Sequence, residues 1–250
     1  MFLIYVNDLP SCLRQCDLTL YADDTVIYTS AKDAATLEAQ LNIDLQIISK
    51  WFFDTLNENK CKFVLFGSAQ KLKTFQNFSL RINDSSLERT DSFKYLGVAI
   101  NQSMTWQDHI STITKKVNQR IGVLRRVKHV LPLQARLTLY KSLVLPLFYY
   151  GDIVWGDKNN STLMENLQTL QNKAAKIILD HHPQSSATEA LDSLGWKPLH
   201  LRRRFHRCAT IFKCLHGFID FNFHFVRNSS IHNYSTRSRD DFHLPLVRTN

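Results

Sequence analysis

Two short runs of β-branched and aromatic residues flank a pair of adjacent aspartates near the start of the chain. The runs cover residues 18–21 (LTLY) and 25–28 (TVIY), and Asp23 and Asp24 lie between them. Such runs have the length and composition of β-strands, and polar residues between them fit a tight turn. The pattern therefore predicts a β-hairpin with both aspartates at its tip.

A change of periodicity near residue 101 divides the chain into two parts. Before it, apolar residues spaced three and four apart predict a helix over 33–56, and β-rich runs predict strands at 62–66, 78–82 and 93–100, with a turn at 83–86. After it, helical spacing predicts helices at 106–131, 134–150, 162–180, 187–194 and 199–216. We expect an α+β fold with a mixed domain over 1–100, a basic helical domain over 101–220 and a poorly ordered tail over 221–250.

Positive charge is concentrated in the second part of the chain. The net charge is +9, and 21 of the 31 Lys and Arg residues follow residue 100, whereas 12 of the 22 Asp and Glu residues precede it. A basic segment of this kind favours a polyanionic partner through phosphate contacts. A solvated surface that keeps the protein soluble explains the same charge equally well.

Cysteine usage and hydropathy give weaker constraints on where the protein works. The five cysteines are scattered and odd in number, which favours a reducing compartment over a disulfide framework. The longest apolar run, residues 137–155, contains Lys141 and Asp152. Such charges are costly inside a bilayer, so we expect a buried helix and no membrane association.

Adjacent carboxylates at a hairpin tip suit a hard divalent cation. Mg²⁺ prefers oxygen ligands and takes one or two carboxylates together with phosphate oxygens. In a two-metal site, such ions stabilise the attacking and leaving oxygens of a phosphoryl displacement. Asp23 and Asp24 are the candidate ligands, although aspartate is also a common solvated turn residue.

Several segments resemble one family in order and spacing. Tyr21-Ala22-Asp23-Asp24 between two apolar runs is similar to the motif of reverse transcriptase palms, and residues 2–10 are similar to the segment before it in jockey-type elements. Residues 51 and 56–61 resemble the next palm motif, and residues 93–98 resemble the primer-grip hairpin. Weaker similarities follow at residues 139–144, 150–156 and 170–175. Over residues 2–200 the chain thus resembles the reverse transcriptase of a non-LTR (LINE-like, jockey-type) retrotransposon.

The resemblance implies an RNA-directed DNA polymerase with a partial palm followed by a helical thumb. It implies Mg²⁺ or Mn²⁺ as cofactor, an RNA template, a DNA primer, dNTP substrates, and residence in the nucleus and cytoplasm. Asp23 and Asp24 would be the metal ligands, and Lys60 would donate a proton to the leaving pyrophosphate. Lys60 is equally well explained as a surface lysine beside a turn.

The resemblance also assigns binding roles. Tyr21 and Ala22 would line the nucleotide and primer end, while Tyr95, Leu96 and Gly97 would contact the primer backbone. Gly97 would allow close approach of a phosphate chain, or it marks only a bulge. Basic residues of the helical part are candidates for backbone contacts, namely Lys115, Lys116, Arg120, Arg125, Arg126, Arg202, Arg203 and Arg204.

The chain departs from the family pattern at its amino-terminal end. The family palm uses a further metal-binding aspartate, which would precede residue 1, as would the fingers. We therefore expect an amino-terminally truncated fragment that is inactive alone. A decayed or repurposed nucleic-acid-binding remnant is the alternative. An unrelated palm-type enzyme such as a cyclase is disfavoured by the segments after residue 93.

A second set of possible metal ligands lies near the end of the chain. His206, Cys208, Cys214 and His216 have an unusual spacing for zinc, and they fall inside a predicted helix without sharing one face. We therefore expect no zinc site there.

Overall fold

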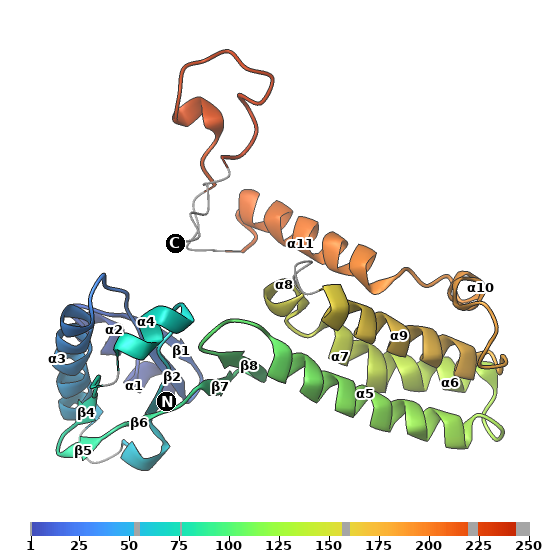
Figure 1. Cartoon of the computed structure of the whole chain (residues 1–250), viewed down its shortest axis with the longest axis horizontal. Coiled ribbons are helices and arrows are strands. Elements are labelled where there is room, and N and C mark those ends of the chain that lie inside the picture. The colour runs from blue at the N-terminus through green and yellow to red at the C-terminus, as the bar shows by residue number, and fades with distance from the viewer. Residues whose placement is uncertain (1, 53–55, 76, 157–160, 220–224, 244–250) are drawn as a thin grey trace. The chain divides into compact units, whose positions relative to one another are not determined.

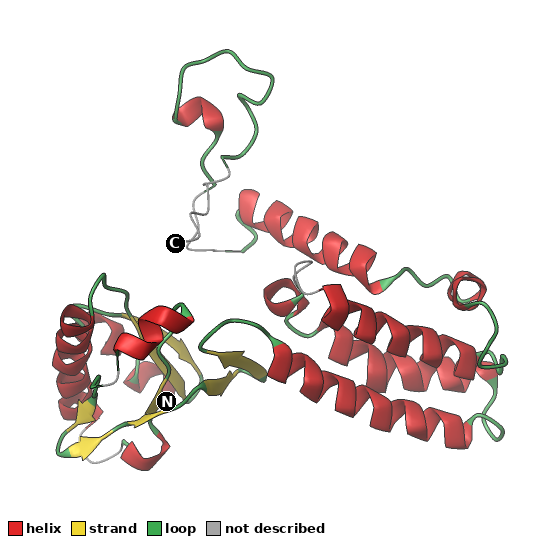
Figure 2. Cartoon of the chain, in the orientation of Figure 1, coloured by secondary structure: helices red, strands yellow, loops and turns green. Residues whose placement is uncertain are grey.

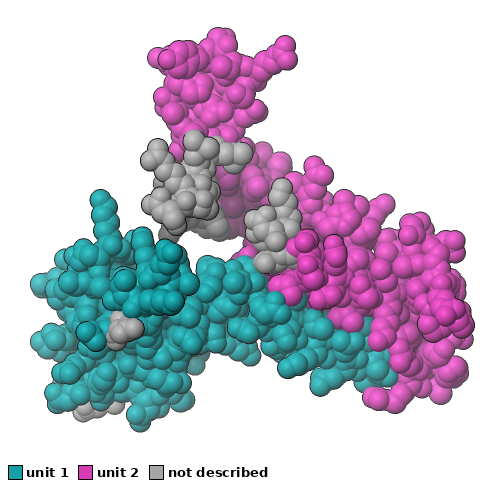
Figure 3. Space-filling model, in the orientation of Figure 1, with its two compact units in different colours: residues 1–123 teal, residues 124–250 magenta. Residues whose placement is uncertain are grey.

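The computed structural model describes residues 2–52, 56–75, 77–156, 161–219 and 225–243. The chain forms two compact units, Met1–Val123 and Leu124–Asn250 (Figure 3). All named strands belong to the first unit, and the second unit is built from helices (Figure 2). This composition confirms the predicted α+β class. The predicted domain boundaries at residues 100 and 220 remain predictions.

The first unit combines small two-stranded sheets with long helices (Figure 1). Its elements are α1 (Phe2–Tyr5), α2 (Leu9–Cys12), β1 (Asp17–Tyr21), β2 (Asp24–Tyr28), α3 (Ala34–Phe52), η2 (Glu58–Lys60), β3 (Lys62–Phe63), α4 (Ala69–Thr74), β4 (Arg81–Ile82), β5 (Ser85–Ser86), β6 (Glu88–Arg89), β7 (Ser92–Tyr95), β8 (Val98–Asn101) and α5 (Gln107–Val127), which continues into the second unit.

The predicted hairpin and long helix are confirmed in this unit. β1 and β2 pair antiparallel from Asp17↔Tyr28 to Tyr21↔Asp24. Helix α3 covers the first part of the predicted range 33–56, and residues 53–55 of that range lie outside the described residues. Its apolar face packs with Leu65, Phe78, Leu80 and Ile82 in one buried cluster. Burial of this face stabilises the helix more than intrinsic propensity does.

The predicted strands at 62–66 and 78–82 are shorter than expected. Strand β3 covers only Lys62–Phe63 and pairs in parallel with β6, while β4 is limited to Arg81–Ile82. The expected turn at 83–86 contributes Ser85–Ser86 to a strand, β5, that pairs with β4. Apolar residues of these two runs pack in the cluster against α3. Their hydrophobicity therefore indicates burial against the helix and not a long β-strand.

The second unit is a set of packed helices. Its elements are α6 (Leu133–Leu139), the π-helix η3 (Tyr140–Val144), α7 (Leu145–Tyr149), α8 (Asp152–Trp155), α9 (Ser161–Ile178), α10 (Ala187–Ser193), α11 (Leu199–Leu215) and η4 (Asn228–Ser230). Helix α9 contacts α6, α10 and α11. Tyr140 stacks on Trp196 with ring centroids 4.1 Å apart, and Phe148 and Leu167 are fully buried.

One irregularity in this unit has a local cause. The predicted helix 134–150 contains a π-helical turn, in which the amide of Leu145 donates to the carbonyl of Tyr140. Pro146 follows directly, and proline has no amide to donate to the carbonyl four residues earlier. Short π-turns inside α-helices accommodate such interruptions.

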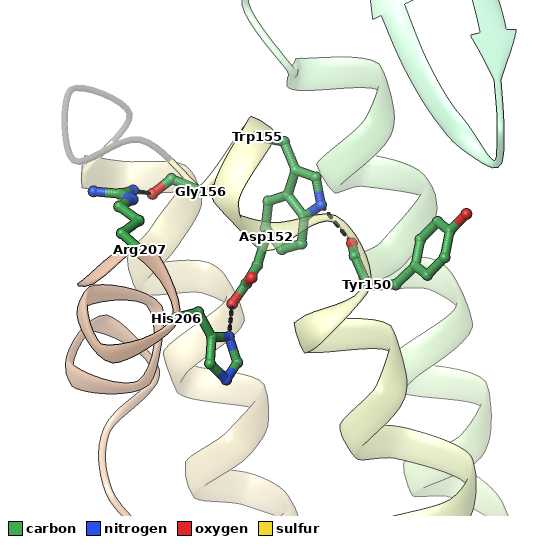
Figure 4. Close-up of polar contacts among 6 residues, drawn as sticks. All are labelled: Tyr150, Asp152, Trp155, Gly156, His206 and Arg207. Atoms are coloured by element: carbon green, nitrogen blue, oxygen red, sulfur yellow. Dashed lines mark hydrogen bonds and ion pairs between the residues drawn. The ribbon is translucent and has the colours of Figure 1, made fainter. Parts of the chain in front are cut away.

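A buried polar junction joins α8 to α11 (Figure 4). Asp152 is 2% exposed, and its Oδ2 lies 2.7 Å from Nδ1 of His206. Arg207 donates to the carbonyl of Gly156, and the indole of Trp155 donates to the carbonyl of Tyr150 at 2.8 Å. A Cβ on Gly156 would clash with the Asp152 carbonyl oxygen, so this glycine permits the close approach.

The described part of the expected tail also has internal contacts. An antiparallel bridge links Arg227 and Phe242, and the Arg227 guanidinium lies 5.4 Å from the Phe242 ring centroid. Residues 221–224 and 244–250 of the expected tail lie outside the described residues.

Candidate metal and nucleic-acid site

The two aspartates lie at the exposed tip of the β1–β2 hairpin. Tyr21 pairs with Asp24, which leaves Ala22 and Asp23 as a two-residue loop. The side chains of Asp23 and Asp24 are both exposed, and Tyr21 is 62% exposed. Two adjacent carboxylates are therefore presented to solvent at the end of a paired ribbon.

The loop backbone is unusual for its sequence. Ala22 has a φ of 53°, whereas Asp23 does not have a positive φ. This is the sign pattern of a type II′ turn, in which glycine is the usual first loop residue. A non-glycine residue in this region is strained, and such strain is often found at functional sites.

Strand β7 brings Tyr95 close to Asp24. The Tyr95 hydroxyl is buried and has no hydrogen-bond partner among the described residues. Burial raises the pKa of Tyr95, and the negative charge of Asp24 raises it further. The structure therefore brings together two residues that are 71 positions apart in the sequence.

Leu96 and Gly97 form the turn between β7 and β8, with φ values of 45° and 83°. Two positive φ values are typical of a type I′ turn, so Gly97 has a role in the turn itself.

Lys60 lies at the end of η2 and is exposed. Its neighbour Glu58 accepts a 2.7 Å hydrogen bond from Nδ2 of Asn83, which links η2 to the β4–β5 turn. In the part of the chain that the structure describes, Lys60 forms no ion pair with either aspartate. Its proposed proton-donor role thus depends on the family resemblance.

Helix α5 has one buried and one basic side. Ile110, Ile113, Val117, Ile121 and Leu124 are buried at helical spacing. Lys115 and Lys116 are exposed, Arg120 is partly exposed, and Arg125 and Arg126 are exposed one to two turns later. Asp108 is the only acidic residue of the helix. With a rise of 1.5 Å per residue, Lys115 and Arg126 are about 16 Å apart along the axis, a length that spans several phosphates of a nucleic acid.

His109 on the same helix was not identified from the sequence. Its Nδ1 accepts a 3.2 Å hydrogen bond from the amide of Ala99 on β8, so it connects α5 to the β7–β8 hairpin. Burial lowers the pKa of His109, and the positive charge of Lys116 lowers it further. The neutral imidazole is the form that can accept this bond.

We expect acidification to weaken this link. A histidine with a lowered folded-state pKa contributes stability that is fully present above its unfolded pKa of 6.5 and is lost as pH falls through the folded-state value. The H109N variant keeps a side-chain acceptor but does not titrate. Urea unfolding between about pH 7.5 and pH 5.5 should therefore show a steeper loss of stability for the wild type than for H109N. Equal slopes would contradict the assignment.

Helix α11 divides its arginines between two environments. Arg202 and Arg204 are exposed, whereas Arg203 is 5% exposed and lies beside Asp152. Burial lowers the pKa of Arg203, and the Asp152 carboxylate opposes that shift. Arg203 thus contributes to the α8–α11 junction and is not available for a surface contact in this structure. Large apolar side chains are also exposed on α11, namely Leu201, Phe205, Ile211, Phe212 and Leu215.

The possible zinc ligands near the end of the chain have other neighbours. His206 pairs with Asp152, and His216 stacks on Phe212 with ring centroids 4.0 Å apart. Among the described residues, no three His, Cys, Asp or Glu side chains are grouped so that they could hold a metal ion. None of the helices in the described ranges combines the length and apolar character needed to cross a membrane.

Comparison with known proteins shows what the first part of the chain is similar to. Residues 1–100 match the family model of reverse transcriptase (RNA-dependent DNA polymerase). This match covers the hairpin with Asp23 and Asp24, Lys60 and the β7 strand. No solved structure matches the chain.

Relatives among curated proteins extend the similarity beyond residue 100. The RNA-directed DNA polymerase from mobile element jockey of Drosophila melanogaster is 23% identical over 191 residues, which are 71% of this chain and 20% of that protein. The probable RNA-directed DNA polymerase from transposon BS of the same species is 26% identical over 72% of this chain and 21% of its own length. A Pol polyprotein from the type-1 retrotransposable element R1 of Nasonia vitripennis is 25% identical over 77% of this chain and 60% of its own length.

Residues 1–100 are therefore similar in sequence to the reverse transcriptase family. The chain is related, at low identity, to the RNA-directed DNA polymerases of jockey-like non-LTR retrotransposons. It spans about a fifth of the length of the jockey and BS proteins.

Proposed function

We propose that the chain is part of an RNA-directed DNA polymerase of a mobile element and supplies Asp23 and Asp24 to its metal site. The observation that carries this proposal is the pair of exposed carboxylates at the tip of a hairpin within the reverse transcriptase region. In this proposal, residues 1–100 are the carboxyl-terminal part of a palm and the helices after them are a thumb. The substrates are dNTPs, an RNA template and a DNA primer, in the nucleus and cytoplasm.

The donor set fits Mg²⁺ or Mn²⁺ in part. Carboxylate oxygens are hard ligands, and Mg²⁺ usually combines one or two of them with phosphate oxygens of the substrate. Asp23 and Asp24 are exposed and can face a triphosphate. The described residues group no third acidic ligand with them, so a further carboxylate would have to come from outside this set. When bound, the metal would stabilise charge on the transferred phosphoryl group.

The other residues of the region have supporting roles in this proposal. Tyr21 and Ala22 line the nucleotide and the primer end, and Tyr95, Leu96 and Gly97 contact the primer backbone. Tyr95 lies near Asp24, which supports a site that includes both residues. Lys60 donates a proton to the leaving pyrophosphate. The exposed basic residues of α5, and Arg202 and Arg204 of α11, contact nucleic-acid backbone.

Metal binding at the hairpin tests the proposal. Mn²⁺ added to isotope-labelled protein should broaden the amide signals of Ala22, Asp23 and Asp24 first. The D23N variant removes one charged ligand and should weaken this effect by about tenfold or more. A D84N variant, which changes an exposed aspartate in another turn, serves as the control. Equal broadening in wild type and D23N would contradict the assignment.

A positive primer-extension result would exclude the alternative, a nucleic-acid-binding remnant without catalysis. The alternative is supported by the basic side of α5. We expect no extension of a DNA primer on an RNA template by the 250-residue chain alone. Extension that disappears in D23N would show instead that the chain is a working polymerase.

A further inference from the structure

A buried carboxylate lies on the apolar face of α3. Asp44 is 0% exposed and is followed by the buried Leu45. Leu41, three residues before Asp44, packs into the same cluster as Leu45. An acidic side chain in such a position is unfavourable unless hydrogen bonds satisfy it. The hydrogen-bond partners of Asp44 therefore explain how its carboxylate is tolerated at this buried position.

Three consecutive backbone amides bind the Asp44 carboxylate. Oδ2 accepts hydrogen bonds from the amides of Gln15 at 2.8 Å and Cys16 at 2.7 Å, and Oδ1 accepts one from the amide of Arg14 at 3.1 Å. Burial alone would raise the pKa of Asp44, but the bonds from these amides lower it below its usual value. The carboxylate is thus held in its charged form, in which such bonds are strongest.

The side chain of Cys16 adds a second link between the same segment and α3. Its Sγ donates to the carbonyl of Gln40 at 3.8 Å. Burial and the neighbouring Asp44 raise the pKa of Cys16 to about 12. The thiol therefore stays protonated and keeps its donor role. Residues 14–16 are attached to one side of α3 by both contacts.

The anchored segment is the base of the hairpin that carries Asp23 and Asp24. Strand β1 begins at Asp17, directly after Cys16, and pairs with β2 alone among the described strands. Thr29 closes the base through a 3.4 Å bond from its hydroxyl to the carbonyl of Gln15. A two-stranded ribbon is marginally stable by itself, so its direction depends on the contacts at its base and on the packing of Ile27 against the α3 cluster.

We propose that Asp44 is a positioning residue that orients the β1–β2 hairpin and thereby places Asp23 and Asp24. This inference rests on the proposed metal-binding function of those two aspartates. Asp44 acts through the backbone of residues 14–16 and touches neither metal nor substrate. The tip is about 20 Å from this anchor, at about 3.3 Å per residue, so a tilt of about 2° moves it by about 0.7 Å. Catalytic groups tolerate roughly 0.5 Å of displacement.

The D44N variant tests the proposal. Asparagine has the same shape but one oxygen acceptor, so its amide group faces at least one backbone N–H that now lacks a partner. We expect amide hydrogen exchange to accelerate by about tenfold or more in β1 and β2, with little change in β7 and β8. Mn²⁺ affinity at the hairpin should fall by about tenfold.

S49A is the matched control. Ser49 is also a buried polar residue of α3, and its hydroxyl donates to Oδ1 of Asn83 at 2.5 Å, away from the hairpin. Its loss should lower thermal stability without a selective change in β1–β2 exchange or in Mn²⁺ affinity. If D44N leaves hairpin exchange and Mn²⁺ affinity unchanged, or if both variants loosen the unit uniformly, the proposal is overturned.

Two further variants complete the test. D44E keeps the carboxylate but is longer by one methylene, so it should fold and still weaken Mn²⁺ binding by shifting the base. Should D44N not fold, unchanged Mn²⁺ affinity in folded D44E would overturn the proposal. D23N separates the two functions, because it should remove Mn²⁺ binding while β1–β2 exchange stays at the wild-type rate. If the wild type does not bind Mn²⁺, the proposed metal site is wrong. If D44N still accelerates amide exchange selectively in β1 and β2, the role of Asp44 in holding the hairpin stands independently of the metal site.

Discussion

Replacing Asp152 by alanine is expected to destabilise the second unit by about 3–5 kcal/mol. Asp152 is 2% exposed and pairs with His206 at 2.7 Å (Figure 4). Arg203 lies beside it at 5% exposure, and the Asp152 charge supports its protonated form against burial. Removing the carboxylate would leave a buried guanidinium without its counter-charge, which costs more than the pair itself contributes.

Urea unfolding followed by tryptophan fluorescence measures this effect. Trp155 and Trp196 both belong to the second unit and report on its packing. D192A removes an exposed aspartate from α10 of the same unit and should change stability by less than about 0.5 kcal/mol. A D152A variant as stable as D192A would show that the α8–α11 junction does not depend on this charge.

Removing three basic side chains from α5 is expected to weaken nucleic-acid binding strongly. The triple variant K115A, K116A and R120A removes up to three phosphate contacts from the basic side of the helix. Each contact contributes about 0.9 to the slope of log affinity against log salt on a duplex, so the slope should fall by about 2–3. At low salt, affinity for an RNA–DNA hybrid should fall by roughly 100-fold.

Fluorescence anisotropy with a labelled hybrid at several salt concentrations measures both quantities. The control triple K71A, K73A and R81A removes the same number of exposed basic side chains from α4 and β4. This control should keep the wild-type salt slope, because its residues lie outside the proposed surface. Equal losses in both triples would mean that net charge, rather than the α5 surface, determines binding.

Elements with strong local periodicity were predictable from the sequence. The hairpin around Asp23 and Asp24, helix α3 and most of the later helices follow from apolar spacing and β-branched runs, because burial of one face selects the matching period. The short strands β3 and β4 were predicted too long, since a run of apolar residues signals burial without specifying a partner strand. The π-turn at Tyr140–Val144 is traceable to Pro146, yet periodicity alone does not distinguish it from a regular helix.

The site shows the same division between local and distant information. The sequence alone identified the adjacent carboxylates, the family-like motif and the concentration of basic residues after residue 100. It did not identify Asp44 or Asp152 as buried acceptors, because their partners are 28–30 and 54 residues away. Secondary-structure patterns depend on residues that are close in sequence, so they can be predicted from the sequence. Only the folded chain creates the contacts that bury Asp44, Asp152 and Arg203. The same is true of the contacts that hold the base of the β1–β2 hairpin.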